Sequence, residues 1–284
     1  MKKLYSLLAL VLAGTACQQQ ATPTHAVALL PTEVAATVAP QKLNLPSQLL
    51  AADTLTPPML ALLQAYDLSP LWRGHELGAL DSVTVLDGFF GLDHYRISFV
   101  FTQVRQDTVD KAVFHIAGKS RYKSQILPFA GLLRVQRLAD LDHHYLDLAP
   151  EDSSAQGYTA NASFTFEENA AGPNAGNFEG VAILDFYISS KGEVNYAQIM
   201  GGEGAPARGQ GLLIKGSWIS NKNGQKKDLL LARSVFSIAP DVLKNFSIGD
   251  RDATINPKYA KLGWNNYWKN DEWWAETPKP SLNL

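Results

Sequence analysis

The alternation of apolar and polar residues at positions 158–166 constrains the fold more than any other feature of the chain. In the run Tyr-Thr-Ala-Asn-Ala-Ser-Phe-Thr-Phe, every even-numbered position is apolar and every odd-numbered position is polar. A period of two places one face of an extended strand in a core and the other in water, and a helix cannot satisfy it. The run therefore predicts a β-strand with one buried face.

Two more strands are expected directly after it. Residues 178–188 continue the apolar face at even positions, and a turn at residues 190–192 leads into residues 194–200. If Phe166 pairs with Phe178, the same counting places Gly180 opposite position 164, and the second turn places Ile188 opposite Val194. Small residues then occupy the middle of an otherwise aromatic face; they are Ala160, Ala162, Gly180 and Ala182. Because a mid-strand glycine marks a bend or a close approach to the backbone, we expect a curved sheet wrapped around something that fills this space.

Strand signals recur over most of the remaining chain. Residues 95–104, 112–117, 125–138, 211–220 and 226–236 are strand candidates, and Asn223-Gly224 is the strongest two-residue hairpin signal. That turn would place Trp218 opposite Leu229 and Gly216 opposite Leu231. The pattern predicts a mainly β fold, an antiparallel meander of roughly nine or ten strands that forms a barrel or a two-sheet sandwich. A barrel is favoured because long open strands leave exposed edges.

The first residues have the features of a secretory leader. Two lysines precede an apolar run at residues 4–13 that is too short to span a bilayer, and small residues follow at 14–16. Cys17, the only cysteine, comes next. The run Leu-Ala-Gly-Thr-Ala-Cys at residues 12–17 resembles the lipobox of bacterial lipoprotein precursors, with Gly14 where Leu is usual. The resemblance implies that Cys17 is lipidated and anchors the mature chain in the membrane, and Gln18 after it implies sorting to the outer membrane of the cell envelope. Removal of an ordinary leader after Ala16, leaving a free thiol, is the alternative.

Composition divides the chain into five parts. We expect a signal peptide (1–16), a flexible tether (17–46), a short helical segment (47–70), an antiparallel β domain (71–250) and a Trp-rich C-terminal segment packed on that domain (251–284). The tether is rich in Gln, Ala, Thr, Pro and Val and cannot bury enough surface to fold alone. Pro57 and Pro58 suit the first turn of the helix.

Charge and motifs exclude several function classes. Lys and Arg number 25 against 27 Asp and Glu, or 23 once Lys2 and Lys3 leave with the leader, so no nucleic-acid partner is expected. His-x-x-x-His spacing is absent and no second cysteine can help to bind zinc, so we expect no metal. No serine lies in a nucleophile motif. We therefore predict no catalytic residue and no cofactor.

Two groups of residues are candidate binding sites. Lys119, Arg121 and Lys123 alternate, which places them on one face if the segment is extended. Such a face binds a carboxylate, a phosphate or an anionic headgroup, or it is a solvated face or the protection of an edge strand.

The second group is a cluster of four of the six tryptophans: Trp264, Trp268, Trp273 and Trp274. Flat rings with neighbouring Asn and Asp residues suit a sugar. The alternatives are a hydrophobic cap over the small-residue face, because each ring buries a large area, and contact with a partner protein.

Three functions remain open from the sequence. The first is a non-enzymatic, lipid-anchored binding or interaction module, in one version a container for an apolar small molecule. The second is a carbohydrate-binding surface lipoprotein that uses the C-terminal tryptophans. The third, an envelope hydrolase, requires Asp93, His94, Asp142 and His144 to converge in one cleft.

Overall fold

The computed structural model describes residues 55–75, 83–146, 148, 150–169, 175–197, 204–244, 254–269 and 271–276. The predicted signal peptide, Cys17 and the predicted tether lie outside these residues, as does the tail after residue 276.

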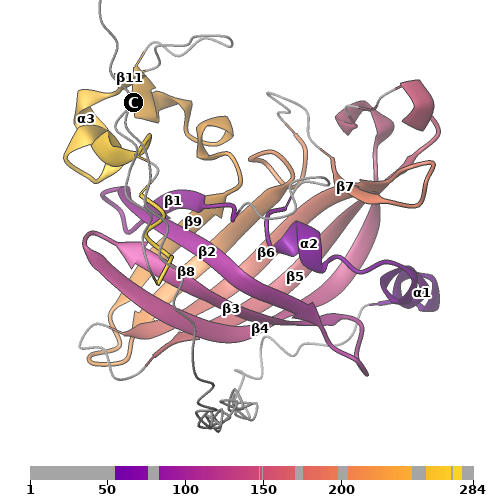
Figure 1. Ribbon diagram of the computed structural model, residues 1–284, viewed down its shortest axis with the longest axis horizontal. Helices are drawn as coiled ribbons and strands as arrows, with labels where there is room; N and C mark the ends of the chain where they lie inside the picture. Colours follow the sequence, from indigo (N-terminus) through magenta and orange to yellow (C-terminus); the bar gives the residue numbers. More distant parts are fainter. Residues whose placement is uncertain are drawn as a thin grey trace, which may run out of the picture. The chain divides into compact units, whose positions relative to one another are not determined.

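The chain forms a mainly β fold built around a closed ring of strands (Figure 1). The strands are β1 (Leu86–Phe90), β2 (Tyr95–Gln106), β3 (Val113–Tyr122), β4 (Gln125–Leu141), β5 (Gln156–Glu168), β6 (Gly176–Ile188), β7 (Val194–Tyr196), β8 (Leu212–Ser220) and β9 (Lys226–Ala232). All pairings are antiparallel, in the order β5-β4-β3-β2-β1-β9-β8-β6, and a β5–β6 pairing closes the ring. The prediction of a β meander is confirmed, and of its two forms the chain adopts the barrel.

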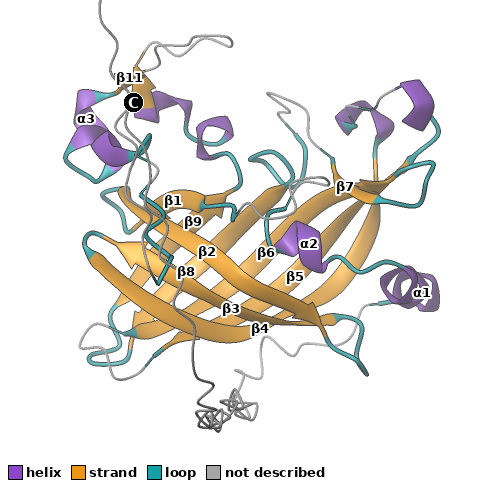
Figure 2. Ribbon diagram, viewed as in Figure 1, coloured by secondary structure: helices purple, strands orange, loops and turns teal. Residues whose placement is uncertain are grey.

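Short helices flank the ring (Figure 2). They are α1 (Pro57–Ala65), α2 (Ser69–Trp72), α3 (Pro257–Ala260) and the 3-10 turns η1 (His143–Tyr145), η2 (Pro150–Asp152), η3 (Val235–Ser237), η4 (Pro240–Val242) and η5 (Trp264–Asn266). A second small sheet pairs β10 (Leu243–Lys244) with β11 (Thr254–Ile255). The predicted helix is α1, which begins at the two prolines. Within the described chain, no helix is both long and apolar enough to cross a bilayer.

The expected register of the central hairpins is confirmed. Phe166 pairs with Phe178 across the β5–β6 hairpin, and Ile188 pairs with Val194 across the β6–β7 turn. The register predicted for the β8–β9 hairpin is wrong by two residues, because Trp218 pairs with Lys227 and Gly216 with Leu229.

The error in the β8–β9 hairpin comes from the length of its loop. Ser220 donates its backbone N–H to the carbonyl of Gln225 (2.9 Å), so four residues rather than two form the connection. Gly224 has a φ of +67°, whereas Asn223 is not in the left-handed region that a two-residue turn requires at both positions. A shift of two residues leaves every side chain on its predicted face.

Two mid-strand glycines lie where neighbouring strands approach closely. Gly180 and Gly216 face each other across the β6–β8 pairing. A Cβ atom on Gly180 would lie 2.2 Å from the carbonyl oxygen of Lys215, and one on Gly216 would lie 2.1 Å from that of Glu179. Only glycine permits this approach, so of the two roles expected of a mid-strand glycine the structure shows the close approach to the backbone.

Phenylalanine rings fill the middle of the barrel. Phe99 of β2 and Phe178 of β6 belong to strands on opposite sides of the ring, and their centroids lie 4.8 Å apart. Phe129 of β4 lies 5.0 Å from Phe99 and 5.3 Å from Phe166 of β5. The expected small residues Ala160, Ala162 and Ala182 are buried in the same cluster. Protein side chains thus meet across the ring, which argues against a container for an apolar ligand.

Different contacts are found at the two ends of the ring. At the end that includes Val113 and Ile188, α2 places Trp72 in the core, and the hydroxyl of Tyr196 donates to the carbonyl of Leu71. At the other end Glu168 accepts hydrogen bonds from Ser120 Oγ (2.7 Å), Trp218 Nε1 (2.9 Å) and the N–H of Gly176 (3.0 Å). Burial raises the pKa of Glu168, and the three donors oppose that rise.

Candidate functional site

The described C-terminal segment, residues 254–269 and 271–276, packs on the outer face of β1, β2 and β3. Trp264 is fully buried there, and its Nε1 donates to the carbonyl of His94 (3.1 Å). Its ring meets Phe89 of β1 edge to face at 5.4 Å. The N–H of Arg96 in β2 donates to the carbonyl of Leu262 (2.8 Å). The cap expected over the small-residue face therefore lies on the opposite side of the sheet, because phenylalanine side chains already cover the small residues inside.

The four tryptophans of this segment have different environments. Trp264 and Trp273 are buried, Trp274 is half-buried, and Trp268 is 60% exposed. The Trp268 ring contacts Tyr267, edge to face at 4.8 Å, and Phe236 at 5.8 Å. The cluster is therefore part cap and part surface.

The basic run meets the tryptophan cluster. Lys119 and Arg121 point outward from β3, where Lys119 Nζ donates to the carbonyl of Trp274 (2.7 Å). The guanidinium of Arg121 pairs with Asp271 (2.5 Å) and lies 4.8 Å from the ring centroid of Trp273. Two candidate groups that are some 150 residues apart in sequence thus form one site.

Lys123 departs from the expected single face. It lies in the β3–β4 turn with a φ of +57°, not on the strand. Its ammonium group lies 5.1 Å from the ring centroid of Tyr95 and 5.3 Å from that of Tyr122. The alternation places Lys119 and Arg121 correctly, but the chain reverses before Lys123.

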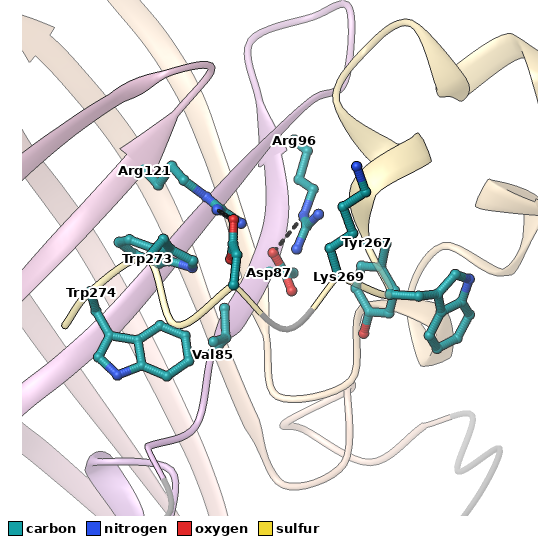
Figure 3. Close-up of a pocket in the computed structure, with 10 residues that line it drawn as sticks. Val85, Asp87, Arg96, Arg121, Tyr267, Lys269, Trp273 and Trp274 are labelled. Carbon is teal, nitrogen blue, oxygen red and sulfur yellow. Dashed lines mark hydrogen bonds and ion pairs between the residues drawn. The ribbon is translucent and has the colours of Figure 1, made fainter. Parts of the chain in front are cut away.

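A buried ion pair lies beneath the segment (Figure 3). Arg96 Nε donates to Asp87 Oδ1 at 2.8 Å, and the two side chains are 7% and 8% exposed. Ser98 Oγ donates to the same oxygen at 2.5 Å. The guanidinium lies 4.9 Å from the ring centroid of Tyr267 and 5.9 Å from that of Trp264. Burial, together with the nearby Asp87, raises the pKa of Tyr267.

A pocket of about 600 Å³ opens between the segment and the strands. We call it the cationic pocket, because five of its side chains are cationic and Asp271 is the one carboxylate in its described lining. Its lining comprises Tyr95, Arg96, Ser98, Arg121, Lys123, Ser124, Ala260, Lys261, Gly263, Asn265, Asn266, Lys269 and Asp271. The whole chain has a formal net charge of −2, so positive charge is concentrated here.

A second pocket of about 250 Å³ adjoins the first. We call it the aromatic pocket; Val85, Asp87, Arg96, Arg121, Tyr267, Trp268, Lys269, Asp271, Trp273 and Trp274 line it (Figure 3). Arg96, Arg121, Lys269 and Asp271 line both pockets. Cationic and aromatic surfaces are therefore continuous.

No protein-family model, curated protein or solved structure matches this chain. Only the geometry of the site therefore bears on function.

The residues suggested for hydrolysis lie apart. Asp93 and His94 are in the β1–β2 turn, whereas Asp142 and His144 follow the end of β4 at the opposite end of the ring. Asp142 and His144 pair with each other on the surface (2.9 Å). Among the described residues no group of three His, Cys, Asp or Glu side chains could hold a metal ion. These four residues therefore do not converge in one cleft, as acid–base chemistry by them would require.

Sequence reasoning missed part of the site. Arg96 carries a signal, because it is a charged residue on the outward face of a long predicted strand and such a residue requires a partner or water. Lys261 and Lys269 carry none, because their relation to β2 and β3 depends on where the segment folds back.

Proposed function

We propose that this chain is a lipid-anchored lipoprotein of the cell envelope, attached to the outer membrane through Cys17, whose barrel domain binds an acidic ligand without chemical change. The observation that carries the proposal is the cationic pocket, where five cationic side chains face one carboxylate. A concave site with one sign of charge attracts ligands of the opposite sign.

Three of the five cations are available to a ligand. Arg96 and Arg121 already pair with Asp87 and Asp271. Lys123, Lys261 and Lys269 are exposed, and none of them pairs with a carboxylate of a described residue. An incoming carboxylate or phosphate would therefore provide their counter-charge.

The rival functions have less support. The rings that meet across the barrel leave little reason to place an apolar ligand inside it. A hydrolase would need the carboxylates and histidines that lie at opposite ends of the ring.

Calorimetric titration with inorganic pyrophosphate tests the proposal, since this small anion has no ring to stack. The triple variant Lys123→Glu, Lys261→Glu, Lys269→Glu should weaken binding by at least about tenfold. The affinity of the unaltered chain should fall as salt is added.

The matched control is Lys191→Glu, Lys222→Glu, Lys226→Glu, which changes net charge equally at exposed lysines outside the pocket. This variant should bind pyrophosphate nearly as well as the unaltered chain. Equal losses in both triple variants, or no binding by the unaltered chain, would refute a specific anion site.

Anchoring has a separate test. Mass spectrometry of the mature protein should find Cys17 as the first residue, carrying acyl chains, because several chains are needed for stable anchoring. A mature chain that begins with an unmodified cysteine would reject the lipoprotein proposal and leave the binding site unaffected.

A further inference from the structure

We infer that the acidic ligand is an oligosaccharide, with its charged groups in the cationic pocket and a sugar ring on the exposed face of Trp268. This inference rests on the anion-binding function proposed above and adds the class of ligand. It follows from the way in which the two pockets join.

The size and continuity of the two pockets favour an extended ligand. The cationic pocket measures about 600 Å³ and the aromatic pocket about 250 Å³. Arg96 and Arg121 line both, as do Lys269 and Asp271 from the C-terminal segment. A ligand that enters one pocket can therefore continue into the other, and an isolated phosphate would leave most of the space empty.

The chemistry changes from one pocket to the other. The cationic pocket adds amide and hydroxyl groups from Asn265, Asn266, Ser98 and Ser124 to its charges. Such groups donate to and accept from sugar hydroxyls. The aromatic pocket adds indole and phenol rings. A chain of sugar units that bears carboxylate, sulfate or phosphate groups combines both requirements.

Trp268 is the natural stacking surface. Its side chain is 60% exposed, yet Tyr267 and Phe236 fix its ring at 4.8 Å and 5.8 Å. A ring that is already fixed loses little conformational entropy when a ligand covers it. The exposed part of the ring lines the aromatic pocket, where the face of a sugar can cover it.

Single-stranded nucleic acid also combines phosphates with flat rings, and it binds to cationic grooves with aromatic side chains. The formal net charge of −2 and the expected export of the chain favour the saccharide. Nucleic acid is therefore an outcome of the test.

The test is calorimetric titration of the full mature chain in detergent with two acidic series, oligogalacturonates and hyaluronate oligosaccharides. In at least one series, the hexamer should bind about tenfold more tightly than the shortest member, because a longer chain occupies both pockets. A methyl-esterified hexamer of the same sugar should lose about tenfold in affinity, since it keeps the rings without the charges.

Trp268→Ala should lower affinity for that hexamer about fivefold to tenfold and leave pyrophosphate binding unchanged, and Trp268→Phe should restore part of the loss. Because the side chain is exposed, unfolding should be unaffected and a loss of binding cannot be ascribed to misfolding.

Three results would overturn the inference. If pyrophosphate fails to bind, the proposed anion site falls and this inference falls with it. If pyrophosphate binds but neither hexamer exceeds its shortest member, or Trp268→Ala has no effect, only the saccharide assignment fails. If an oligothymidylate binds more tightly than both hexamers, the ligand class is nucleic acid.

Discussion

The buried ion pair beneath the C-terminal segment allows a quantitative prediction. Asp87→Asn keeps the size of the side chain and removes its charge. The Arg96 side chain, which is only 7% exposed, then has no counter-ion. Breaking a buried pair by removing one partner costs about 3–5 kcal/mol of unfolding free energy, because the remaining charge stays desolvated. For a domain of this size, each kcal/mol lowers Tm by about 2–4 °C. The expected loss in Tm is therefore about 6–20 °C.

The pair of Arg121 and Asp271 is a matched control on the same face of the barrel. It is a shorter contact, at 2.5 Å, but Asp271 is 48% exposed. An ion pair open to solvent contributes about 0–1 kcal/mol, so Asp271→Asn should lower Tm by no more than about 4 °C.

The assay is urea unfolding followed by tryptophan fluorescence, with Tm measured in parallel. The double variant Asp87→Asn, Arg96→Met should recover most of the loss, because no buried charge is left unpaired and Met retains part of the packing against the Trp264 and Tyr267 rings. If Asp87→Asn and Asp271→Asn cost the same, or if the double variant is no better than Asp87→Asn alone, burial of the charge does not determine the energy and the reasoning fails.

Three further predictions concern a buried tryptophan, the close approach of β6 and β8, and pH. Trp264→Ala should cost about 3–5 kcal/mol in urea unfolding, whereas exposed Trp268→Ala should be nearly neutral; equal losses would contradict the burial argument. Gly180→Ala should destabilise by about 1–3 kcal/mol or more, because its Cβ meets a backbone carbonyl oxygen at 2.2 Å. In Gly157→Ala the new Cβ meets side-chain carbons of Leu146 and Leu141, the nearest at 2.8 Å, so this variant should cost clearly less. Burial raises the pKa of Asp185 from 3.8 to about 6 despite its bonds from Thr159 and Ala207. The folded state then binds more protons than the unfolded state between about pH 4 and pH 6, so the unfolding free energy should fall as pH rises through that window. Asp185→Asn should flatten this fall. Equal slopes of unfolding free energy against pH in the variant and the unaltered chain would refute the role of Asp185.

Local pattern determined much of the fold. The alternation at residues 158–166 and the short turn at 190–192 specify which side chains share a face and which residues pair, because both depend on neighbours along the chain. The β8–β9 hairpin marks the limit of this reasoning. The sequence predicts correctly which face each side chain of this hairpin occupies. The register depends on whether Asn223 adopts a left-handed conformation, and an asparagine favours that conformation but does not require it.

The candidate site was predicted in separate parts. The basic run and the tryptophans were each recognisable from residue type and spacing. That Arg121 meets Asp271 and Trp273 depends on a contact across 150 positions, which no local pattern encodes. The sequence also could not separate buried Trp264 from exposed Trp268, because the same residue type serves either role.

The sequence by itself determined that this chain is mainly pleated and which faces of its strands are apolar, since period and turn chemistry act over a few residues. The tertiary structure alone decided that β1 pairs with β9 to close the ring, that phenylalanines meet across it, and that the C-terminal segment folds back over the outside of β1, β2 and β3. These outcomes depend on competition between distant surfaces for burial. That competition is resolved only when the whole domain is packed. The cationic pocket forms because the C-terminal segment then lies against the outer face of the strands.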